Sequence, residues 1–249
     1  DFAQVSILKP RESIMNTISV AGSHDPLIDE IADIIKQRWQ SIEVASSHVG
    51  SMGGIMAVKR SEAQMGGIHL LDSNTGQYNL PYLEKYFPNG GVVLIEGVKR
   101  IQGIMVKRGN PLGIRGFTDL SARGISFVNR QKGSGTRILF DYLCEENHMD
   151  SEKIYGYQRE EYTHTGVAAQ IAAGTADAGL GIFSSAKIYG LDFIPVGHEE
   201  YDILADKESL SYDKVKKFIE VLHSGQLKRR LCELGGYEVT NPGTIKKEL

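Results

Sequence analysis

Residues 125–143 read ISFVNRQKGSGTRILFDYL and contain a candidate strand, a loop rich in glycine and hydroxyl residues, and a candidate helix. The apolar run at 125–128 is typical of a buried strand. After the loop, Ile138, Leu139, Tyr142 and Leu143 recur at helical spacing. A strand that passes through such a loop into a helix is the repeating unit of α/β folds.

The same alternation of strand and helix continues along most of the chain. Further candidate strands lie at 18–21, 42–45, 67–71, 92–95, 103–106, 178–182 and 193–196. Helical patterns cover 26–39, 138–143, 167–172, 212–224 and 226–234. This order predicts α/β layering with a largely parallel sheet.

Two segments, 97–111 and 195–206, have the character of crossings between lobes. If both cross, lobe 1 is discontinuous and consists of residues 18–103 and 203–249, whereas residues 104–202 form lobe 2. Residues 1–17, with Lys9, Pro10 and Arg11, have the composition of a linker or arm.

Composition excludes several classes of function. The chain has 249 residues, of which 41% are hydrophobic, so two modest cores are feasible. Its 28 basic and 31 acidic residues nearly balance, so nucleic acid is not an expected partner of this domain. No apolar run approaches the roughly 18 residues of a membrane span and no signal segment opens the chain, so we expect a cytoplasmic protein without a span. Cys144 and Cys232 lie among apolar residues and are expected to be buried free thiols.

Motifs for catalysis, metals and cofactors are absent. The candidate serines lack the flanking glycines of a nucleophile elbow, and no phosphate-binding loop or dinucleotide fingerprint is present. The seven histidines show no metal-ligand spacing. We therefore expect no catalytic residue, no metal site and no cofactor in this domain.

Four loops join a candidate strand to a helix start: 21–26, 50–54, 133–137 and 162–166. The first backbone N–H groups of a helix lack internal partners, and the helix dipole places partial positive charge there. Glycine lets a ligand approach closely, and Ser or Thr adds a neutral donor. Converging helix starts therefore indicate a site for a small tetrahedral oxyanion at the carboxyl ends of the strands.

Each loop alone has a simpler interpretation, because Ser and Thr are common helix caps. Ser23 with Asp25 is that ordinary case, and Asp25 is expected to complement the dipole of the first turn. It is also the one carboxylate in these loops that can accept the proton of phosphate, which keeps phosphate as an alternative. Two glycines and two hydroxyls before Arg137 are harder to explain as a cap.

Several stretches together resemble the periplasmic-binding-protein-like domain related to molybdate- and tungstate-binding proteins. They are 21–26 AGSHDP, 67–72 GIHLLD, 129–137 NRQKGSGTR, 161–168 EYTHTGVA, 176–182 ADAGLGI and 191–195 LDFIP with Tyr201-Asp202. The resemblance covers about residues 18–205. It implies a type II α/β fold with two lobes, mixed sheets flanked by helices, and a ligand cleft between them.

The resemblance also implies how the ligand is held. Ser23 and Ser51 correspond to hydroxyl donors of lobe 1, and Ser134, Gly135, Thr136 and Thr165 to donors of lobe 2. The full candidate set adds neighbouring residues of the same loops, namely His24, Met52, Arg130, Arg137 and His164. The basic residues depart from the neutral sites of extracytoplasmic scavengers.

The expected function is non-catalytic capture or sensing of molybdate or tungstate, in molybdenum cofactor (molybdopterin) biosynthesis or in molybdate-responsive regulation. Such domains are often fused to molybdopterin molybdenumtransferase or helix-turn-helix modules, so the full-length protein is open to an enzymatic role. The alternative class is an effector-sensing domain of the LysR type, which binds a small organic ligand. Hinge closure over the substrate is the expected mechanism of this substrate-binding domain.

Overall fold

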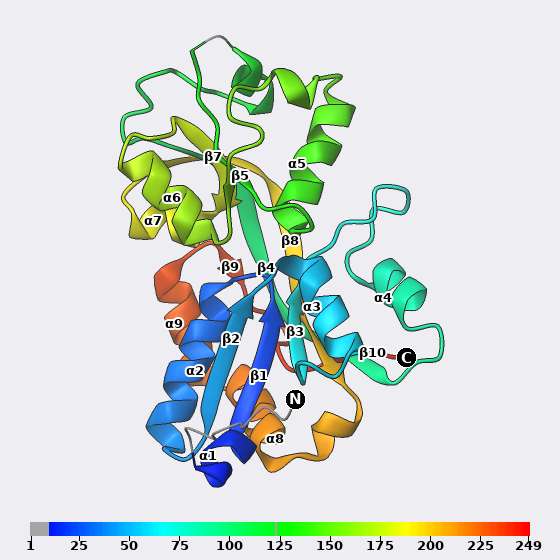
Figure 1. Ribbon diagram of the computed structural model, residues 1–249. Helices are drawn as coiled ribbons and strands as arrows, with labels where there is room; N and C mark the ends of the chain where they lie inside the picture. The colour runs from blue at the N-terminus through cyan, green and yellow to red at the C-terminus, as the bar shows by residue number, and fades with distance from the viewer. Residues whose placement is uncertain (1–9, 123) are drawn as a thin grey trace, which may run out of the picture.

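The computed structural model describes residues 10–122 and 124–249, which form two lobes joined by long strands (Figure 1). Lobe 1, lower in Figure 1, holds both ends of the described chain, and lobe 2 holds its middle part. Helices flank the sheet in both lobes. The α/β fold with two lobes and a mixed sheet is therefore confirmed.

The elements follow one another as the alternating pattern predicts. The helices are α1 Arg11–Met15, α2 Pro26–Arg38, α3 Gly50–Lys59, α4 Leu80–Tyr86, α5 Gly135–Glu146, α6 His164–Ala172, α7 Phe183–Ile188, α8 Asp213–Leu222 and α9 Gly225–Leu234. The strands are β1 Thr17–Gly22, β2 Glu43–His48, β3 Met65–Ile68, β4 Val92–Val106, β5 Asn129–Arg130, β6 Glu160–Glu161, β7 Ala178–Ile182, β8 Asp192–Asp206, β9 Tyr237–Glu238 and β10 Ile245–Glu248.

Helix α2 shows how local sequence sets an element that borders the site. Pro26 occupies the first helical turn, where its missing N–H costs nothing. The Asp25 carboxylate accepts from the Leu27 N–H at 2.7 Å and so caps the helix, as expected. Leu27, Ile31 and Ile34 lie on one buried stripe, which fixes α2 against the sheet of lobe 1.

The main sheet has the strand order β10-β4-β8-β3-β1-β2, with β7 and β9 also paired to β4. Only β1 pairs in parallel, with β2 and β3, whereas β8 and β4 are antiparallel to their neighbours in this sheet. The expectation of a largely parallel sheet is therefore wrong. The reason is that β4 and β8 run between the lobes in opposite directions, so they lie antiparallel to each other.

Strands β4 and β8 pair along almost their whole length, from Val92 opposite Asp206 to Val106 opposite Asp192 (Figure 1). The sequence had placed two separate strands at 92–95 and 103–106, and both belong to β4. The register shifts between Ile95 and Val98 and again between Gln102 and Gly103. A β-bulge or similar irregularity bends a strand locally, so both shifts bend the paired strands between the lobes. The lobe boundaries at residues 103 and 203 fall inside β4 and β8 and stay a prediction.

Each lobe has its own hydrophobic core. Lobe 1 is packed around Ile18, Ile31, Val93, Ile203 and Phe218, with a second cluster beneath α3 and α4. The core of lobe 2 contains Ile104, Phe127, Phe140 and Leu180, and a further cluster lies beneath α6. The lobes are therefore separate packing units connected by the crossing strands.

Several local expectations need correction. Residues 125–128 form no strand: Phe127 makes an isolated bridge with Ala178 at the start of β7, and the Val128 N–H donates to the Ala178 carbonyl at 3.0 Å. Cys144 is buried, but Cys232 is exposed on the outer side of α9. Of the expected arm, 1–9 lie outside the described residues, and Arg11–Met15 form a helix with no buried residue. Within the described ranges, no helix is long and apolar enough to cross a membrane.

Candidate functional site

The two lobes meet where the starts of α3 and α5 approach each other (Figure 1). The Met52 N–H of α3 donates to the Gly133 carbonyl of the loop before α5 at 3.2 Å. A Cβ added to Gly135, the first residue of α5, would collide with the His69 carbonyl and lie 2.6 Å from its ring Nδ1. Glycine at 135 therefore allows the start of α5 to close against lobe 1.

Arg100 lies at the centre of a buried charge network. It is directly opposite Glu199 in the pairing of β4 with β8, and its side chain is 1% exposed. Its Nε donates to the Glu199 carboxylate and its Nη1 to Asp25 of the α2 start. Burial alone would lower its pKa, but the carboxylates of Glu199 and Asp25 raise it, so Arg100 stays charged.

Glu199 continues this network into lobe 1. His69 Nδ1 lies 2.8 Å from Glu199 Oε2, and His69 Nε2 lies 2.8 Å from Ser23 Oγ. Burial opposes ionisation of Glu199, yet Arg100 and His69 lower its pKa to about 2. Burial and the charge of Arg100 lower the pKa of His69 even though Glu199 raises it, so the imidazole is neutral near neutral pH.

Arg130 is the second buried guanidinium, and its surroundings differ. Its Nε donates to Gln131 Oε1 and to the Glu161 carbonyl, both at 3.2 Å, and its Nη2 donates to the Tyr162 carbonyl at 3.0 Å. Among the described residues no carboxylate lies within ion-pair distance of it, and its Nη1 has no partner. Burial and the charge of Arg100 lower its pKa to about 9, which still leaves it charged at neutral pH.

His164 begins α6 and is fully buried with both ring nitrogens unpartnered in the described part of the chain. Burial, followed by the charges of Arg130 and Arg100, lowers its pKa well below the usual 6.5. The ring of His164 lies 6.3 Å from that of His69, measured between centroids. His164 of lobe 2 therefore lies beside the polar network of lobe 1.

Buried polar atoms without a partner gather around this junction. Within the described residues they include His24 Nδ1, Arg100 Nη2, Gln102 Oε1, Arg130 Nη1 and both nitrogens of His164. A buried unsatisfied polar group is costly, and such groups normally have a protein or water partner. Contributions from both lobes, including two guanidiniums, are what a small anion held between the lobes requires.

The structure brings four of the predicted residues to this junction: Ser23, His24, Arg130 and His164. The His24 ring also packs edge-on against His48 with centroids 4.6 Å apart. Ligand contact by these residues stays a prediction.

The predicted residues of α3 and α5 line the contact between lobes. Ser51 Oγ accepts from the His69 N–H at 3.2 Å, and the Met52 side chain is half-buried in the core beneath α3. Ser134 Oγ caps α5 by accepting from the Arg137 N–H at 3.2 Å, and Thr136 Oγ1 accepts from Gln102 Nε2 at 3.2 Å. The free N–H groups of this helix start remain candidate donors.

Two further predicted residues have protein partners. Arg137 pairs with Asp141 at 3.2 Å and with Glu160 at 3.6 Å, and its guanidinium stacks 3.9 Å from the ring centre of Tyr157. Thr165 Oγ1 lies 3.1 Å from Thr163 Oγ1, the capping hydroxyl of α6. Direct contact of either residue with a ligand stays a prediction.

Sequence reasoning missed Arg100 and Gln102 on β4, Glu199 on β8, and His69 directly after β3. A signal existed: Arg100 and Gln102 share one face of β4, and Glu199 and Tyr201 share one face of β8. Each of these faces carries one buried charged residue, Arg100 or Glu199, and such residues are almost never buried unless they are paired. The segments had been interpreted as crossings between lobes, so the alternation within them was not used.

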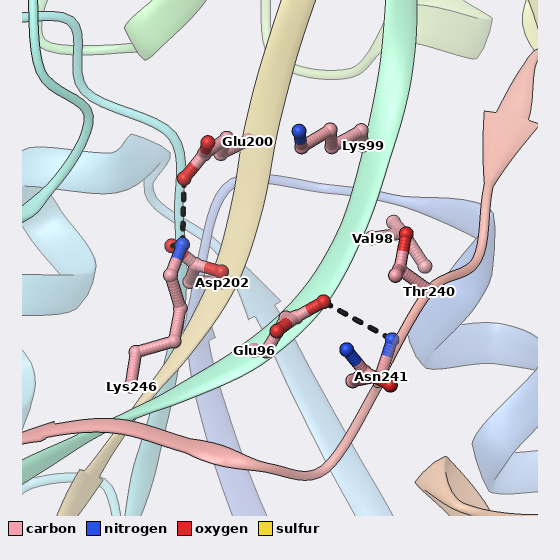
Figure 2. A pocket seen from close by; sticks show the side chains of 8 residues that line it. All are labelled: Glu96, Val98, Lys99, Glu200, Asp202, Thr240, Asn241 and Lys246. Atoms are coloured by element: carbon pink, nitrogen blue, oxygen red, sulfur yellow. Dashed lines mark hydrogen bonds and ion pairs between the residues drawn. The ribbon is translucent and has the colours of Figure 1, made fainter.

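A separate surface pocket lies on the other face of the crossing strands (Figure 2). Its lining consists of Glu96, Val98, Lys99, Glu200, Asp202, Thr240, Asn241 and Lys246. Figure 2 shows Lys246 pointing to Glu200 and Asp202, to which it donates at 2.6 and 2.9 Å. Three carboxylates against two lysines do not favour an oxyanion, so we do not assign the ligand site here. No group of three or more potential metal ligands occurs in the described ranges.

Comparison with known proteins agrees with a binding domain of this architecture. A family model described as the PBP superfamily domain matches residues 32–223. The chain belongs to this superfamily of periplasmic-binding-protein folds. It is 35% identical over 196 residues to the uncharacterized protein YvgK of Bacillus subtilis, and the match covers 79% of this chain but 63% of YvgK.

Solved structures show the same fold at low sequence identity. A candidate phosphate ABC transporter substrate-binding protein with bound phosphate, from Clostridium perfringens, aligns with a TM-score of 0.67 at 15% identity. That alignment covers 91% of this chain and all of the other. An ABC-type phosphate transport receptor from Vibrio cholerae aligns with a TM-score of 0.58 at 18% identity, covering 90% of this chain and all of the receptor.

Proposed function

We propose that this chain captures a small tetrahedral oxyanion between its two lobes. The observation that carries the proposal is Arg130, a fully buried guanidinium that, among the described residues, has no carboxylate within ion-pair distance and no partner for Nη1. An isolated buried charge is expensive to maintain. A bound anion at Nη1 would neutralise it and supply the missing hydrogen bond.

The arrangement of the other polar groups supports a ligand held by both lobes. Arg100 Nη2 belongs to a crossing strand, His164 to lobe 2 and His24 to lobe 1, and all three have unpartnered buried nitrogens. The starts of α5 and α6 add backbone donors beside them. Closure of the lobes over the anion would complete this set, as in other hinged binding proteins.

The identity of the anion is open between two kinds of ligand. Resemblance of the sequence loops to molybdate- and tungstate-binding proteins favours molybdate or tungstate. The two phosphate proteins named above favour phosphate, by analogy of fold alone. An effector-sensing role for an organic ligand is less favoured, because the converging unpartnered groups are polar.

A place in molybdenum cofactor synthesis or molybdate-responsive regulation, a fused transferase or helix-turn-helix module, and a cytoplasmic location are further parts of the proposal. They depend on the sequence resemblance. The match covers 63% of YvgK, less than two thirds of its length, so the activity of any longer protein is a separate proposal.

Calorimetric titration of the ligand-free protein with molybdate, tungstate, sulfate and phosphate tests the proposal. We expect at least one anion to bind with micromolar or tighter affinity. The Arg130→Gln variant should lose that binding, whereas Arg159→Gln, an exposed arginine of lobe 2, should keep it. If none of the four anions binds at millimolar concentration, the oxyanion function is wrong.

A further inference from the structure

Ser23 is oriented by a carboxylate through His69. The Glu199 carboxylate can only accept hydrogen bonds, so it holds the His69 proton on Nδ1, 2.8 Å away. The lone pair of His69 Nε2 then faces Ser23 Oγ at 2.8 Å and accepts the hydroxyl proton. The same carboxylate control of the histidine tautomer operates in serine–histidine–aspartate sites. In this tautomer Ser23 keeps lone pairs that can accept from a ligand, whereas the sequence resemblance implies a donor.

Gln102 provides a second acceptor. Its Nε2 donates to Glu199 Oε1 at 2.8 Å and to Thr136 Oγ1 at 3.2 Å. Because Glu199 accepts only, the amide orientation is determined: the NH₂ group faces the carboxylate and Oε1 faces away. Oε1 is buried and has no partner among the described residues, and the residue is 0% exposed.

His164 adds one donor and one acceptor. A neutral imidazole carries a proton on one nitrogen and a lone pair on the other, and both nitrogens are buried and unpartnered. The site therefore combines unpartnered donors on Arg100 and Arg130 with unpartnered acceptor capacity on Ser23, Gln102 and His164.

The buried charges around the site balance. The carboxylates of Asp25 and Glu199 both pair with Arg100, and Arg130 is the second buried guanidinium, so the formal charges of these four groups sum to zero. These buried groups therefore carry no net positive charge that would favour a dianion. A ligand of lower charge that also donates a hydrogen bond fits this balance better.

We propose that the captured oxyanion carries its own proton, as phosphate and arsenate do at neutral pH, and that Ser23, Gln102 and His164 select it by accepting from its hydroxyl. The proposal rests on the oxyanion-binding function given above. Molybdate, tungstate and sulfate are fully deprotonated and can only accept. Their oxygens would face the lone pairs of Ser23 and Gln102, leaving buried acceptors unpaired, which discriminates against such ligands.

A titration series on the unmodified protein at pH 7 tests the selection. The dissociation constants of phosphate and arsenate are compared with those of sulfate, molybdate and tungstate, which have the same tetrahedral shape. We expect phosphate and arsenate to bind at least about tenfold more tightly than the best of the other three, since one unpaired acceptor is worth about that factor. Equal or tighter binding of sulfate, molybdate or tungstate would overturn the inference while leaving oxyanion capture intact. Absence of binding by all five overturns both.

The Gln102→Leu variant tests the acceptor directly, because leucine keeps the approximate volume and removes Oε1. Phosphate affinity should fall about tenfold and sulfate affinity should not, so the ratio between them shrinks. Gln64→Leu, on lobe 1 where the side chain accepts from the Ser19 N–H, is the matched control and should leave the ratio unchanged. An equal loss for phosphate and sulfate in Gln102→Leu contradicts the proposal. If that variant does not fold, the titration of the unmodified protein with the five anions still tests the proposal.

Discussion

The rings of His69 and His164 lie with centroids 6.3 Å apart, although one belongs to lobe 1 and the other begins a helix of lobe 2. Burial, followed by the charges of Arg100 and Arg130, lowers the pKa of each ring, although Glu199 partly opposes this for His69. The lobes are therefore already in contact at the polar junction. Substitutions there should separate ligand binding from folding.

Arg130→Gln should abolish oxyanion binding, with at least about a hundredfold loss, because a charge-assisted hydrogen bond in a buried site is removed. The free energy of unfolding of the ligand-free protein should fall little. Within the described part of the chain, loss of the Arg130 charge leaves no ion-paired carboxylate without its partner. Calorimetry and chemical denaturation measure the two effects. Loss of folding together with binding would instead assign Arg130 a structural role.

Gly135→Ala should prevent the lobes from closing, because the new methyl group would collide with the His69 carbonyl and ring. We expect weaker anion binding and a larger radius of gyration in solution scattering with ligand present. Gly116→Ala is the matched control, since a Cβ at Gly116 meets no atom within 4 Å and its φ of −164° suits alanine. Unchanged affinity in Gly135→Ala would show that this contact is not needed for capture.

Ser134→Ala and Thr136→Ala should differ in effect. Ser134 caps α5, so its loss should lower the free energy of unfolding by about 1 kcal/mol. Thr136 contacts Gln102 and should mainly affect anion affinity. Denaturation and calorimetry on both single variants and the double variant separate the roles. If affinity is unchanged in the double variant, the glycine-rich loop serves only as a cap.

Acidification should destabilise the ligand-free protein in two steps. The folded-state pKa values of His69 and His164 lie below the ordinary 6.5, so the unfolded chain takes up protons first and stability falls as pH drops below 6.5. Each histidine that stays neutral in the folded state lowers the free energy of unfolding by at most about 1.4 kcal/mol for each pH unit below 6.5. Glu199, with a pKa of about 2 against an ordinary 4.5, adds a loss as pH falls from 4.5 toward 2.

Denaturation curves at a series of pH values measure these slopes. His164→Gln should reduce the slope below pH 6.5, whereas His223→Gln, an exposed histidine at the end of α8, serves as control. An unaltered slope in His164→Gln would mean that this ring does not resist protonation in the folded state.

The sequence predicted the two lobes and the loops that meet between them because both depend on local patterns. Ser23 follows β1, Arg130 ends β5 and His164 begins α6, and parallel or crossing strands bring such loops together. The short helices α4 and α7 were missed, because seven and six residues give too few turns for a periodic signal.

The network behind the loops could not be predicted from local patterns. Arg100 and Glu199 are 99 positions apart and become neighbours only through the register of β4 with β8. Because these charges interrupt apolar runs, the sequence predicted two separate strands where the structure has the single strand β4. Pairing with each other and with Asp25 offsets part of the cost of burying them, and that compensation is visible only in the folded chain.

The most direct test of the central claim is an anomalous difference map from crystals grown with arsenate and, separately, with tungstate. The account predicts a peak between the lobes, with ligand oxygens at hydrogen-bond distance from Arg130 Nη1 and from the His164 ring. A peak elsewhere, such as the pocket of Figure 2, or no peak from either anion at saturating concentration, would contradict it.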